Sequence, residues 1–200
     1  MYLSDYMKED RYIRDQAFFL RRIRQVHKTA GIILLIFFFI ISVSGLLLGW
    51  KKNSSGLLLP DTKRGTTTEL DKWLPLHQLE SHAITFLKDS VSKTLSTQID
   101  RIDVRKNDGV VKFTFENHYY EIQLDGATGE VLHVKKRWSD LLENIHDGSA
   151  LDKLFGIKGE VFKLIYTSIM GLALLIFTLT GFWLWYGTLR LRKRVKHLKS

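Results

Sequence analysis

The sequence predicts a membrane protein with two antiparallel transmembrane α-helices and a small α+β domain, built as a helix on an antiparallel sheet, outside the cytoplasm. Residues 30–50 and 164–187 contain no charged side chain. Each run exceeds the roughly 20 residues that a helix needs to cross a hydrocarbon core about 30 Å thick. Backbone amides in lipid must bond within their own segment, so both runs are expected to be helical. Between them, short segments alternate apolar and polar residues as strands do.

The charge distribution predicts the topology. Residues 51–163 carry 17 basic and 17 acidic residues, so the formal net charge of +9 comes from the two ends. Short basic segments beside a membrane span stay on the cytoplasmic side, and they match an anionic leaflet. Both termini are therefore expected in the cytoplasm and residues 51–162 outside it. The same argument explains the basic ends without nucleic acid as a partner.

The flanks of the first span have predicted roles of their own. Residues 10–28 place apolar side chains opposite arginines, which predicts an amphipathic helix on the inner leaflet that runs into the span. Trp50 is an interface residue, and Lys51 ends the span. We expect the span to remain as an anchor, because no small-x-small cleavage motif is evident. Residues 53–72, rich in Ser, Gly and Thr, indicate a linker.

The polar middle segment predicts one small domain. Residues 76–89, after Pro75, place apolar side chains at helical spacing. Strand patterns follow at 98–106, 110–117, 118–125 and 130–137, with turn residues at 107–109 and 126–129. One helix packed on an antiparallel sheet is the economical arrangement. Residues 138–160 are expected to return to the membrane through a short helix and a glycine-bearing loop.

The sequence offers no pattern for catalysis or for a metal site. The chain has no cysteine, which excludes disulfides, thiolate metal ligands and cysteine nucleophiles. It has no Walker loop, no Gly-x-Ser-x-Gly and no His-Glu-x-x-His. His77 and His82 are a poor fit to one helix face, and no acidic residue completes a site. We therefore predict no catalytic residue and no metal ligand, which favours a protein that is not an enzyme.

The two spans carry small and hydroxyl side chains along one side. In the first span these residues fall within about 60° of one another at 100° per residue. Small residues let helices approach closely in lipid, and hydroxyls can bond across helices. The predicted helix-packing residues are Gly31, Ser42, Gly45, Thr167, Gly171, Thr178 and Gly181. The alternative interpretation is that the glycines make room for a flat macrocycle.

The middle segment resembles a PepSY domain. Residues 119–134 (YYEIQLDGATGEVLHV) resemble the closing strands of that module, where a strand ends in Asp, a turn carries Thr-Gly and a second strand follows. The helix predicted before these strands fits the same module. The resemblance implies a PepSY-like domain over residues 73–137.

The flanking spans resemble PepSY-associated transmembrane helices, and with the domain the resemblance covers about residues 20–187. Four short patterns carry it, and their order makes the match fairly specific. They are His27-Lys28-Thr29-Ala30-Gly31, Ser42-Val43-Ser44-Gly45, His146-Asp147-Gly148 and Thr178-Leu179-Thr180-Gly181. Larger members of the family have four or more spans and include siderophore reductases that hold haem between helices. This chain has two spans and no flavin or nicotinamide domain, so a complete reductase is not implied.

The resemblance makes His27 and His146 candidate ligands of haem b, because neutral imidazole is a common axial ligand. His27 precedes the first span and His146 precedes the second, so the two lie at opposite faces, roughly 30 Å apart. They cannot ligate the same iron within one protomer. A bis-histidine haem would need a second subunit or another ligand. Without haem, His27 is an ordinary interface residue, and Asp147 or Ser149 caps a helix.

These observations lead to three functional hypotheses for a protein of the bacterial inner membrane with a periplasmic domain. The first is a non-enzymatic component of an envelope complex, in contact with lipid and with further copies or other membrane proteins. The second is electron transfer through haem b in iron assimilation, and the third is regulation of an envelope peptidase. The predicted boundaries are 1–28 for the basic arm, 29–50 for the first span, 51–72 for the linker, 73–137 for the PepSY-like domain, 138–162 for the return segment, 163–187 for the second span and 188–200 for the basic tail.

Overall fold

The computed structural model describes residues 2–157 and 159–199, and the chain divides into two compact units. The first unit combines helix α5 (Val161–Lys199) with helix α1 (Tyr2–Gly49) up to Ile41. The second unit runs from Ser42 to Glu160 and contains the remaining helices and all four strands. The last turns of α1 therefore belong to the second unit.

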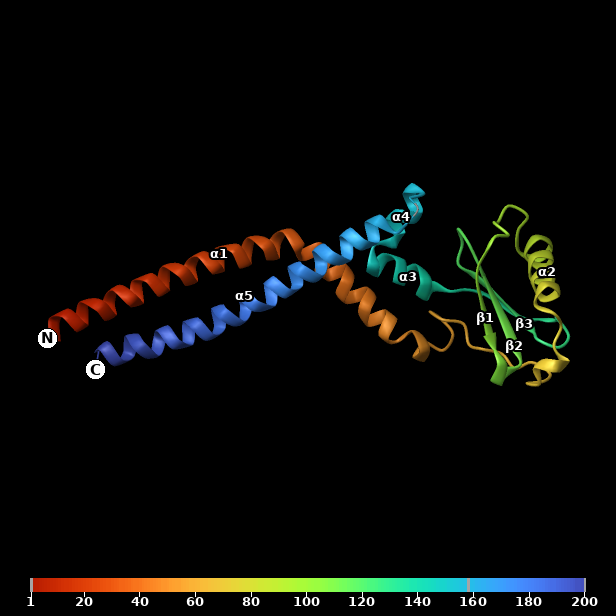
Figure 1. Cartoon of the computed structure of the whole chain (residues 1–200), viewed down its shortest axis with the longest axis horizontal. Helices are drawn as coiled ribbons and strands as arrows, with labels where there is room; N and C mark the ends of the chain where they lie inside the picture. The colour runs from red at the N-terminus through yellow and green to blue at the C-terminus, as the bar shows by residue number, and fades with distance from the viewer. Residues whose placement is uncertain (1, 158, 200) are drawn as a thin grey trace. The chain divides into compact units, whose positions relative to one another are not determined.

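Helices α1 and α5 run side by side and antiparallel (Figure 1). Their contacts show the direction, because partners that rise in number along α1 fall in number along α5. The rings of Phe19 and Trp183 lie 6.5 Å apart between centroids, and those of Phe37 and Tyr166 also lie 6.5 Å apart. The sequence prediction of two antiparallel spans is confirmed.

The basic arm continues α1 as one helix, since no proline or glycine interrupts residues 2–30. The arm pairs with the basic end of α5. Nη1 of Arg194 donates a hydrogen bond to Oε1 of Glu9 at 3.1 Å, and the guanidinium of Arg194 lies 4.4 Å from the ring centroid of Tyr12. Leu20 is buried where Gly187 leaves room for its side chain. That the arm lies on the inner leaflet stays a prediction.

The apolar parts of both helices face outward. Ile36 is 69% exposed and Leu164 is also 69% exposed, and both helices are long and apolar enough to cross a bilayer. Exposure of so many apolar side chains to water would cost roughly 25 cal/mol per Å². The exposed surface is therefore matched to lipid, and the chain is a membrane protein with two spans.

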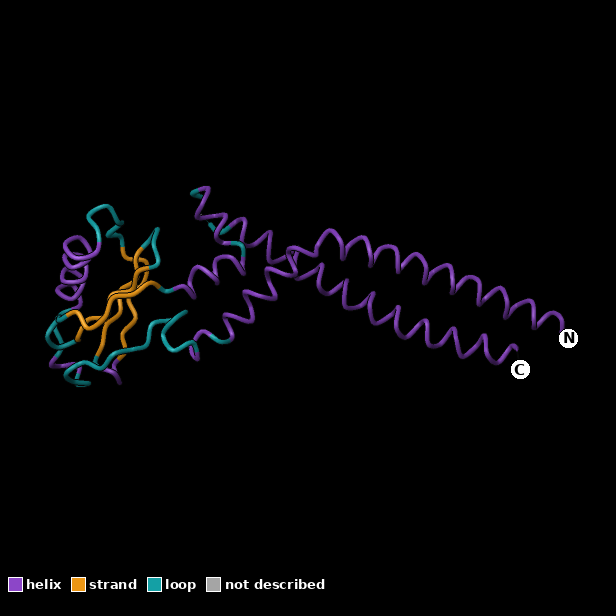
Figure 2. The backbone as a smooth tube through the Cα atoms, turned by 180° about the vertical axis from the view of Figure 1, so that it is seen from behind, coloured by secondary structure: helices purple, strands orange, loops and turns teal. Residues whose placement is uncertain are grey.

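The second unit contains a four-stranded antiparallel meander in the order β1-β2-β3-β4 (orange in Figure 2). The strands are β1 (Ile99–Arg105), β2 (Val110–Phe115), β3 (Tyr120–Asp125) and β4 (Val131–Lys136). The predicted alternation and strand order are present, and each strand is two residues shorter than its sequence pattern. Asn117, at φ 66°, opens the β2–β3 turn, a conformation that Asn tolerates better than most residues.

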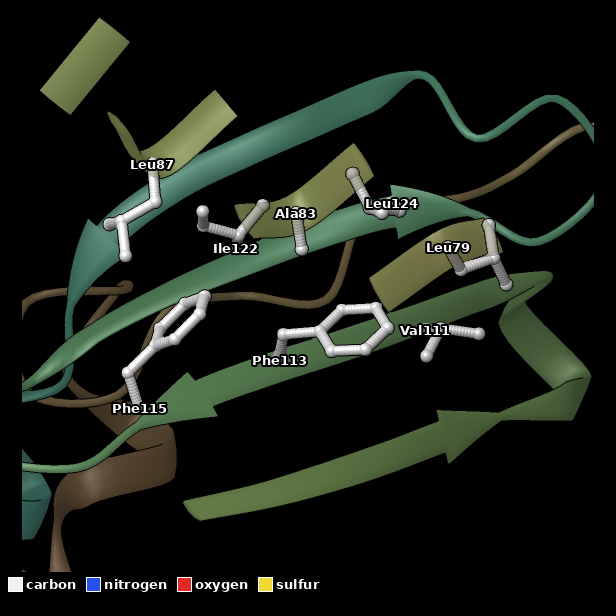
Figure 3. Packing of buried hydrophobic residues seen from close by; sticks show 8 residues of the cluster. All are labelled: Leu79, Ala83, Leu87, Val111, Phe113, Phe115, Ile122 and Leu124. Atoms are coloured by element: carbon white, nitrogen blue, oxygen red, sulfur yellow. The ribbon is translucent and has the colours of Figure 1, made fainter. Parts of the chain in front are cut away.

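One face of the sheet carries the apolar core (Figure 3). Helix α2 (Leu76–Phe86) continues as the π-helical turn η3 (Leu87–Val91) and packs on this face. Pro75 at the N-cap fixes where the helix begins. The buried members of the core are Leu79, Ala83, Leu87, Val111, Phe113, Phe115, Ile122 and Leu124. This is the helix-on-sheet arrangement that the sequence predicts.

The other face of the sheet is polar and is covered by residues 56–66, which we call the strap. The stretch that reads as a linker is bound along β3. Gln123 donates from Nε2 to the carbonyl of Asp61 at 3.0 Å and accepts at Oε1 from the backbone N–H of Lys63 at 2.9 Å. Lys135 donates to the carbonyl of Gly56 at 2.6 Å. The strap thus supplies the hydrogen-bond partners that water would otherwise supply to these polar strand residues.

The return segment forms two helices, α3 (Trp138–Asp147) and α4 (Ser149–Phe155), where the sequence predicts one. Gly148, at φ 81°, lies between them. A residue in the left-handed conformation cannot continue an α-helix, so α3 ends there and the chain changes direction before α4. Further short 3-10 turns are η1 (Lys51–Asn53), η2 (Leu70–Lys72) and η4 (Lys106–Asp108).

Candidate functional site

His27 lies within the first unit, where α1 meets α5. Its Nδ1 is 2.8 Å from Oγ1 of Thr180, and its ring stacks on Phe177 with centroids 3.8 Å apart and planes 22° apart. A Cβ at Gly31 would lie 3.0 Å from the Phe177 ring, and one at Gly181 would lie 3.5 Å from His27 Cε1. Two of the predicted helix-packing glycines therefore lie against the rings of this contact.

Thr180 Oγ1 has three hydrogen-bond partners within reach. It lies 2.8 Å from the carbonyl of Ile176, 3.0 Å from that of Phe177 and 2.8 Å from Nδ1 of His27. A hydroxyl has one proton, so it donates to one of the three. When that proton goes to a carbonyl of its own helix, Nδ1 of His27 donates to Thr180, and Nε2 keeps a lone pair that can accept a hydrogen bond or ligate a metal.

His146 lies within the second unit, against the last turns of α1. Its Nδ1 is 2.9 Å from Oγ of Ser44, which is 3% exposed. A Cβ at Gly45 would lie 3.3 Å from His146 Cε1. The neighbouring Asp147 accepts hydrogen bonds from the backbone N–H and the hydroxyl of Ser149 at 3.0 and 2.7 Å. Asp147 therefore bridges the turn between α3 and α4, while Gly148 is the N-cap of α4 and no side chain caps that helix.

The two histidines repeat one arrangement. In each, an imidazole that precedes one span contacts the second hydroxyl of a hydroxyl-x-hydroxyl-Gly pattern, and the glycine that follows meets the ring. The sequence placed the first hydroxyls, Ser42 and Thr178, in the seam. The structure instead brings Ser44 and Thr180 to the rings, while Thr178 donates to the carbonyl of Leu174 in its own helix at 2.8 Å. Such histidine–hydroxyl hydrogen bonds can fix the position of one helix along another, because lipid chains offer no competing donor or acceptor.

Three further predicted packing residues make no hydrogen bond to another helix within the part of the chain that the structure describes. Thr167 donates to carbonyls of its own helix, and Ser42 is exposed. No heavy atom of the described chain lies within 4 Å of the position that a Cβ on Gly171 would occupy. Packing at these three positions would need a second chain and stays a prediction.

A buried ionic cluster under the sheet is the feature that sequence reasoning missed. Glu121 is 1% exposed and Lys112 is 3% exposed. Arg137 donates to Oε2 of Glu121 at 2.5 Å, Gln123 donates to Oε1 at 2.7 Å, and Lys112 Nζ lies 3.6 Å from Oε1. Arg137 also donates from Nε to Asp140 at 2.9 Å. One buried carboxylate therefore faces two cations, of which Lys112 is buried and Arg137 also reaches the surface.

Burial and neighbours act in opposite directions on these cations. Burial lowers the pKa of Lys112 below its usual value of 10.5, and Glu121 offsets only part of that effect. Burial also acts to lower the pKa of Arg137, but Asp140 and Glu121 outweigh it and the pKa is raised. Outside the cluster, burial lowers the pKa of His133, helped by nearby Lys63. The cluster is thus a structural ion network with Arg137 held firmly as a cation.

Asp125 ties the strap to the end of β3. Oδ2 accepts the N–H and the hydroxyl of Thr66 at 2.7 and 2.5 Å, and Oδ1 accepts the N–H of Ala127 and of Thr128 at 2.8 and 3.2 Å. Burial alone would raise the pKa of Asp125, but the four hydrogen bonds outweigh it and hold the pKa below 3.8.

This lowered pKa predicts a pH dependence for Asp125→Asn. The folded state binds the Asp125 proton less readily than the unfolded state, so its stabilisation is complete above pH 3.8 and is lost as pH falls through the folded pKa. At pH 7 we expect the variant to lose about 1–3 kcal/mol of unfolding free energy. Urea unfolding at pH 7 and below pH 3.8 measures the difference, which should shrink in acid. A pH-independent difference would contradict this role.

The second unit also contains a cleft of about 670 Å³ between the β2–β3 turn and helices α3 and α4. Its polar and aromatic lining includes Asp100, Glu116, Asn117, His118, Tyr119, Arg137 and Lys153. Lys153 Nζ lies 5.7 Å from the ring centroid of Tyr119, whose hydroxyl accepts from Asn144 at 3.1 Å. His118 is fixed by a 3.0 Å hydrogen bond to the carbonyl of Ser96. The cleft thus presents charges of both signs beside aromatic rings.

These features define an integral membrane protein: two spans joined by an α+β domain with a cleft, and histidine–hydroxyl pairs at the helix contacts. The model of the family described as PepSY-associated TM region matches residues 24–199, and the chain belongs to this family. Comparisons with curated proteins and with solved structures gave no match. The family match begins three residues before His27 and includes all four motifs that carried the resemblance.

Proposed function

We propose that this chain is a non-enzymatic component of a bacterial inner membrane that presents its PepSY-like domain in the periplasm and binds a protein partner there. The cleft is the observation that carries the proposal. A concave surface of about 670 Å³ with aromatic and charged groups has the size and chemistry of a binding site. The two spans hold this domain at the membrane, which suits a subunit of an envelope complex.

The lining of the cleft favours a polypeptide. Arg137 is fixed by Glu121 and Asp140, so it loses little conformational freedom when a ligand carboxylate or carbonyl arrives. Asn117, in the β2–β3 turn, is exposed and offers amide donors and acceptors. A peptide chain supplies both backbone polar groups and charged side chains for such a surface.

Site-specific photo-crosslinking tests the proposal. A photoreactive amino acid at Asn117 lines the cleft, and one at exposed Lys88, beside the end of α2, is the matched control. We expect one discrete protein adduct from Asn117 in intact cells and none of that size from Lys88. The adduct should weaken when Lys153→Glu is added. Identical adducts from both positions, or none from Asn117, would contradict partner binding in the cleft.

The orientation of the domain is part of the same proposal. Basic residues flank the spans at both chain ends, while residues 51–163 are balanced between 17 basic and 17 acidic side chains. The positive-inside rule favours retention of the two ends in the cytoplasm. Residues 51–162 then lie in the periplasm, where the cleft can meet envelope proteins.

Electron transfer through haem b is a second candidate function, and one observation favours it. Nδ1 of His27 lies 2.8 Å from Oγ1 of Thr180, so Nε2 is the ring nitrogen that would serve as an axial ligand. His27 and His146 are expected at opposite faces of the membrane, so each would hold a haem of its own with the second ligand from another copy of the chain, and the bound group would supply one-electron chemistry. An absorbance spectrum of the purified protein tests this. A Soret band that His27→Ala removes and His77→Ala retains supports it, and a colourless protein from haem-supplemented cells defeats it.

A further inference from the structure

Helices α3 and α4 turn their polar side chains inward and their apolar side chains outward, the reverse of a helix on a water-soluble domain. Exposure on α4 reaches 63% at Phe155. The buried polar members are Ser139, Asn144, Ser149 and Asp152. The exposed apolar members from the end of α3 onward are Ile145, Leu151, Phe155 and Ile157, whereas exposed Leu154 lines the cleft.

Hydrogen bonds fix which way the two helices face. The Ser149 hydroxyl lies 2.9 Å from Oδ1 of Asn144 and 2.7 Å from Oδ1 of Asp147. Asn144 donates to the Tyr119 hydroxyl at 3.1 Å, which links the helices to the sheet. Rotating either helix to bury its apolar side would break these bonds and leave buried polar groups unpaired, at about 1–3 kcal/mol each. The outward apolar face is therefore built into the fold.

Contacts within the second unit indicate how deep in the membrane this apolar face lies. Ser44 lies inside the uncharged run of the first span, seven residues or about 10 Å of helix before Lys51. The Ser44 Oγ lies 2.9 Å from Nδ1 of His146, near the end of α3. One turn earlier on α3, Oε2 of Glu143 lies 3.8 Å from Nζ of Lys51, the residue that ends the span. The end of α3 therefore lies beside the part of α1 that meets the boundary between headgroups and acyl chains.

The chain itself ties α4 to the second span. Phe155 is six residues before Val161, where α5 begins, so it cannot be more than about 20 Å from the start of the second span. Residues 145–157 are thus tied to a membrane span at both of their ends, by the contacts of α3 with α1 and by the short link to α5.

We infer that residues 145–157 are inserted in the membrane interface, with their outward apolar side chains among the lipids of the leaflet nearest the domain. The occupant of this face is the bilayer. The hairpin of α3 and α4 acts as an interfacial anchor that fixes the domain, and with it the cleft, against the membrane surface. This inference does not depend on the partner or on the direction in which the domain faces.

Lipid and aqueous quenchers test the insertion on the full chain. The protein has no cysteine, so single-cysteine variants can be labelled with the fluorophore NBD without background. The labelled protein is placed in vesicles of phosphatidylcholine and phosphatidylglycerol. Phe155→Cys is the test, exposed Lys93→Cys in the domain is the aqueous control, and Leu172→Cys in α5 is the lipid control.

We expect the Phe155→Cys label to be quenched by nitroxide on the upper acyl chain, as the Leu172→Cys label is, and iodide to quench it about threefold less than the Lys93→Cys label. Leu151→Cys should repeat the result if the first variant fails to fold. Strong iodide quenching of both α4 labels would overturn the inference. Protection from both quenchers would also overturn it, because only another copy of the chain could then cover the face.

Discussion

Replacing Glu121 with Gln should lower the free energy of unfolding of the domain by about 3–5 kcal/mol, because two buried cations lose their shared carboxylate. Lys112 is 3% exposed and Arg137 is mostly buried, so water cannot replace the lost charge. Urea unfolding of the full chain in mild detergent, followed by pulse proteolysis, measures the change. The side chain keeps its shape, so the effect reports charge rather than volume.

Two comparisons make the Glu121→Gln result specific. Glu130→Gln removes an exposed carboxylate and should change stability by less than about 0.5 kcal/mol. Adding Lys112→Met to Glu121→Gln should recover part of the loss, because one of the uncompensated charges disappears. A loss under about 1 kcal/mol for Glu121→Gln alone would show that the cluster is hydrated, contrary to its burial.

Gly65→Ala should detach the strap from the sheet. A Cβ at Gly65 would overlap the backbone carbonyl of Gly109, which accepts a 2.9 Å hydrogen bond from Gly126 and cannot move freely. When the strap lifts, Gln123 and Asp125 lose their partners. Cleavage by trypsin after Lys63 or Arg64 within the strap should then accelerate by about tenfold or more.

Gly49→Ala is the matched control for the strap, because no other segment of the described chain comes within 4 Å of the position that its Cβ would take. Its tryptic cleavage rate within the strap should equal that of the unaltered chain. Equal rates for Gly65→Ala and the unaltered chain would mean that the strap is not held at Gly65, and the polar face of the sheet would then be solvated.

The spans and the sheet are predictable from the sequence because their signals are local. Uncharged runs of sufficient length have one stable form in lipid, and the alternation at Val111, Phe113 and Phe115 places one side of β2 in the core. The opposite alternation, at Lys112 and Thr114, looks solvent-facing. Both residues are buried, Lys112 at its ion pair with Glu121 and Thr114 on the inner wall of the cleft.

The sequence predicts neither the bound strap nor the orientation of helices α3 and α4, for a related reason. A stretch of Ser, Gly, Thr and Pro has no periodicity of its own, so its hydrogen bonds to Gln123 and Asp125 are visible only in three dimensions. The inverted pattern of α3 and α4 also depends on what lies outside the helix. Sequence periodicity locates an apolar face and cannot say whether protein or lipid covers it.

The candidate site was partly predictable. His27, Gly31, Gly45 and His146 came from motifs, and the structure places each of them at a helix contact. The hydroxyls that contact the rings were not distinguished from their neighbours two residues earlier, because both belong to one short pattern. The signal that could have selected them is position, since each lies directly before a glycine that admits a ring.

Single-cysteine accessibility in spheroplasts tests most directly that the chain crosses the membrane twice with its sheet domain exported. Lys93→Cys in the domain and Lys193→Cys in the tail are exposed positions in a chain without other cysteines. A membrane-impermeant maleimide should label Lys93→Cys in intact spheroplasts and Lys193→Cys only after lysis. Labelling of Lys193→Cys alone would reverse the orientation, and labelling of both in intact cells would contradict the two-span hairpin.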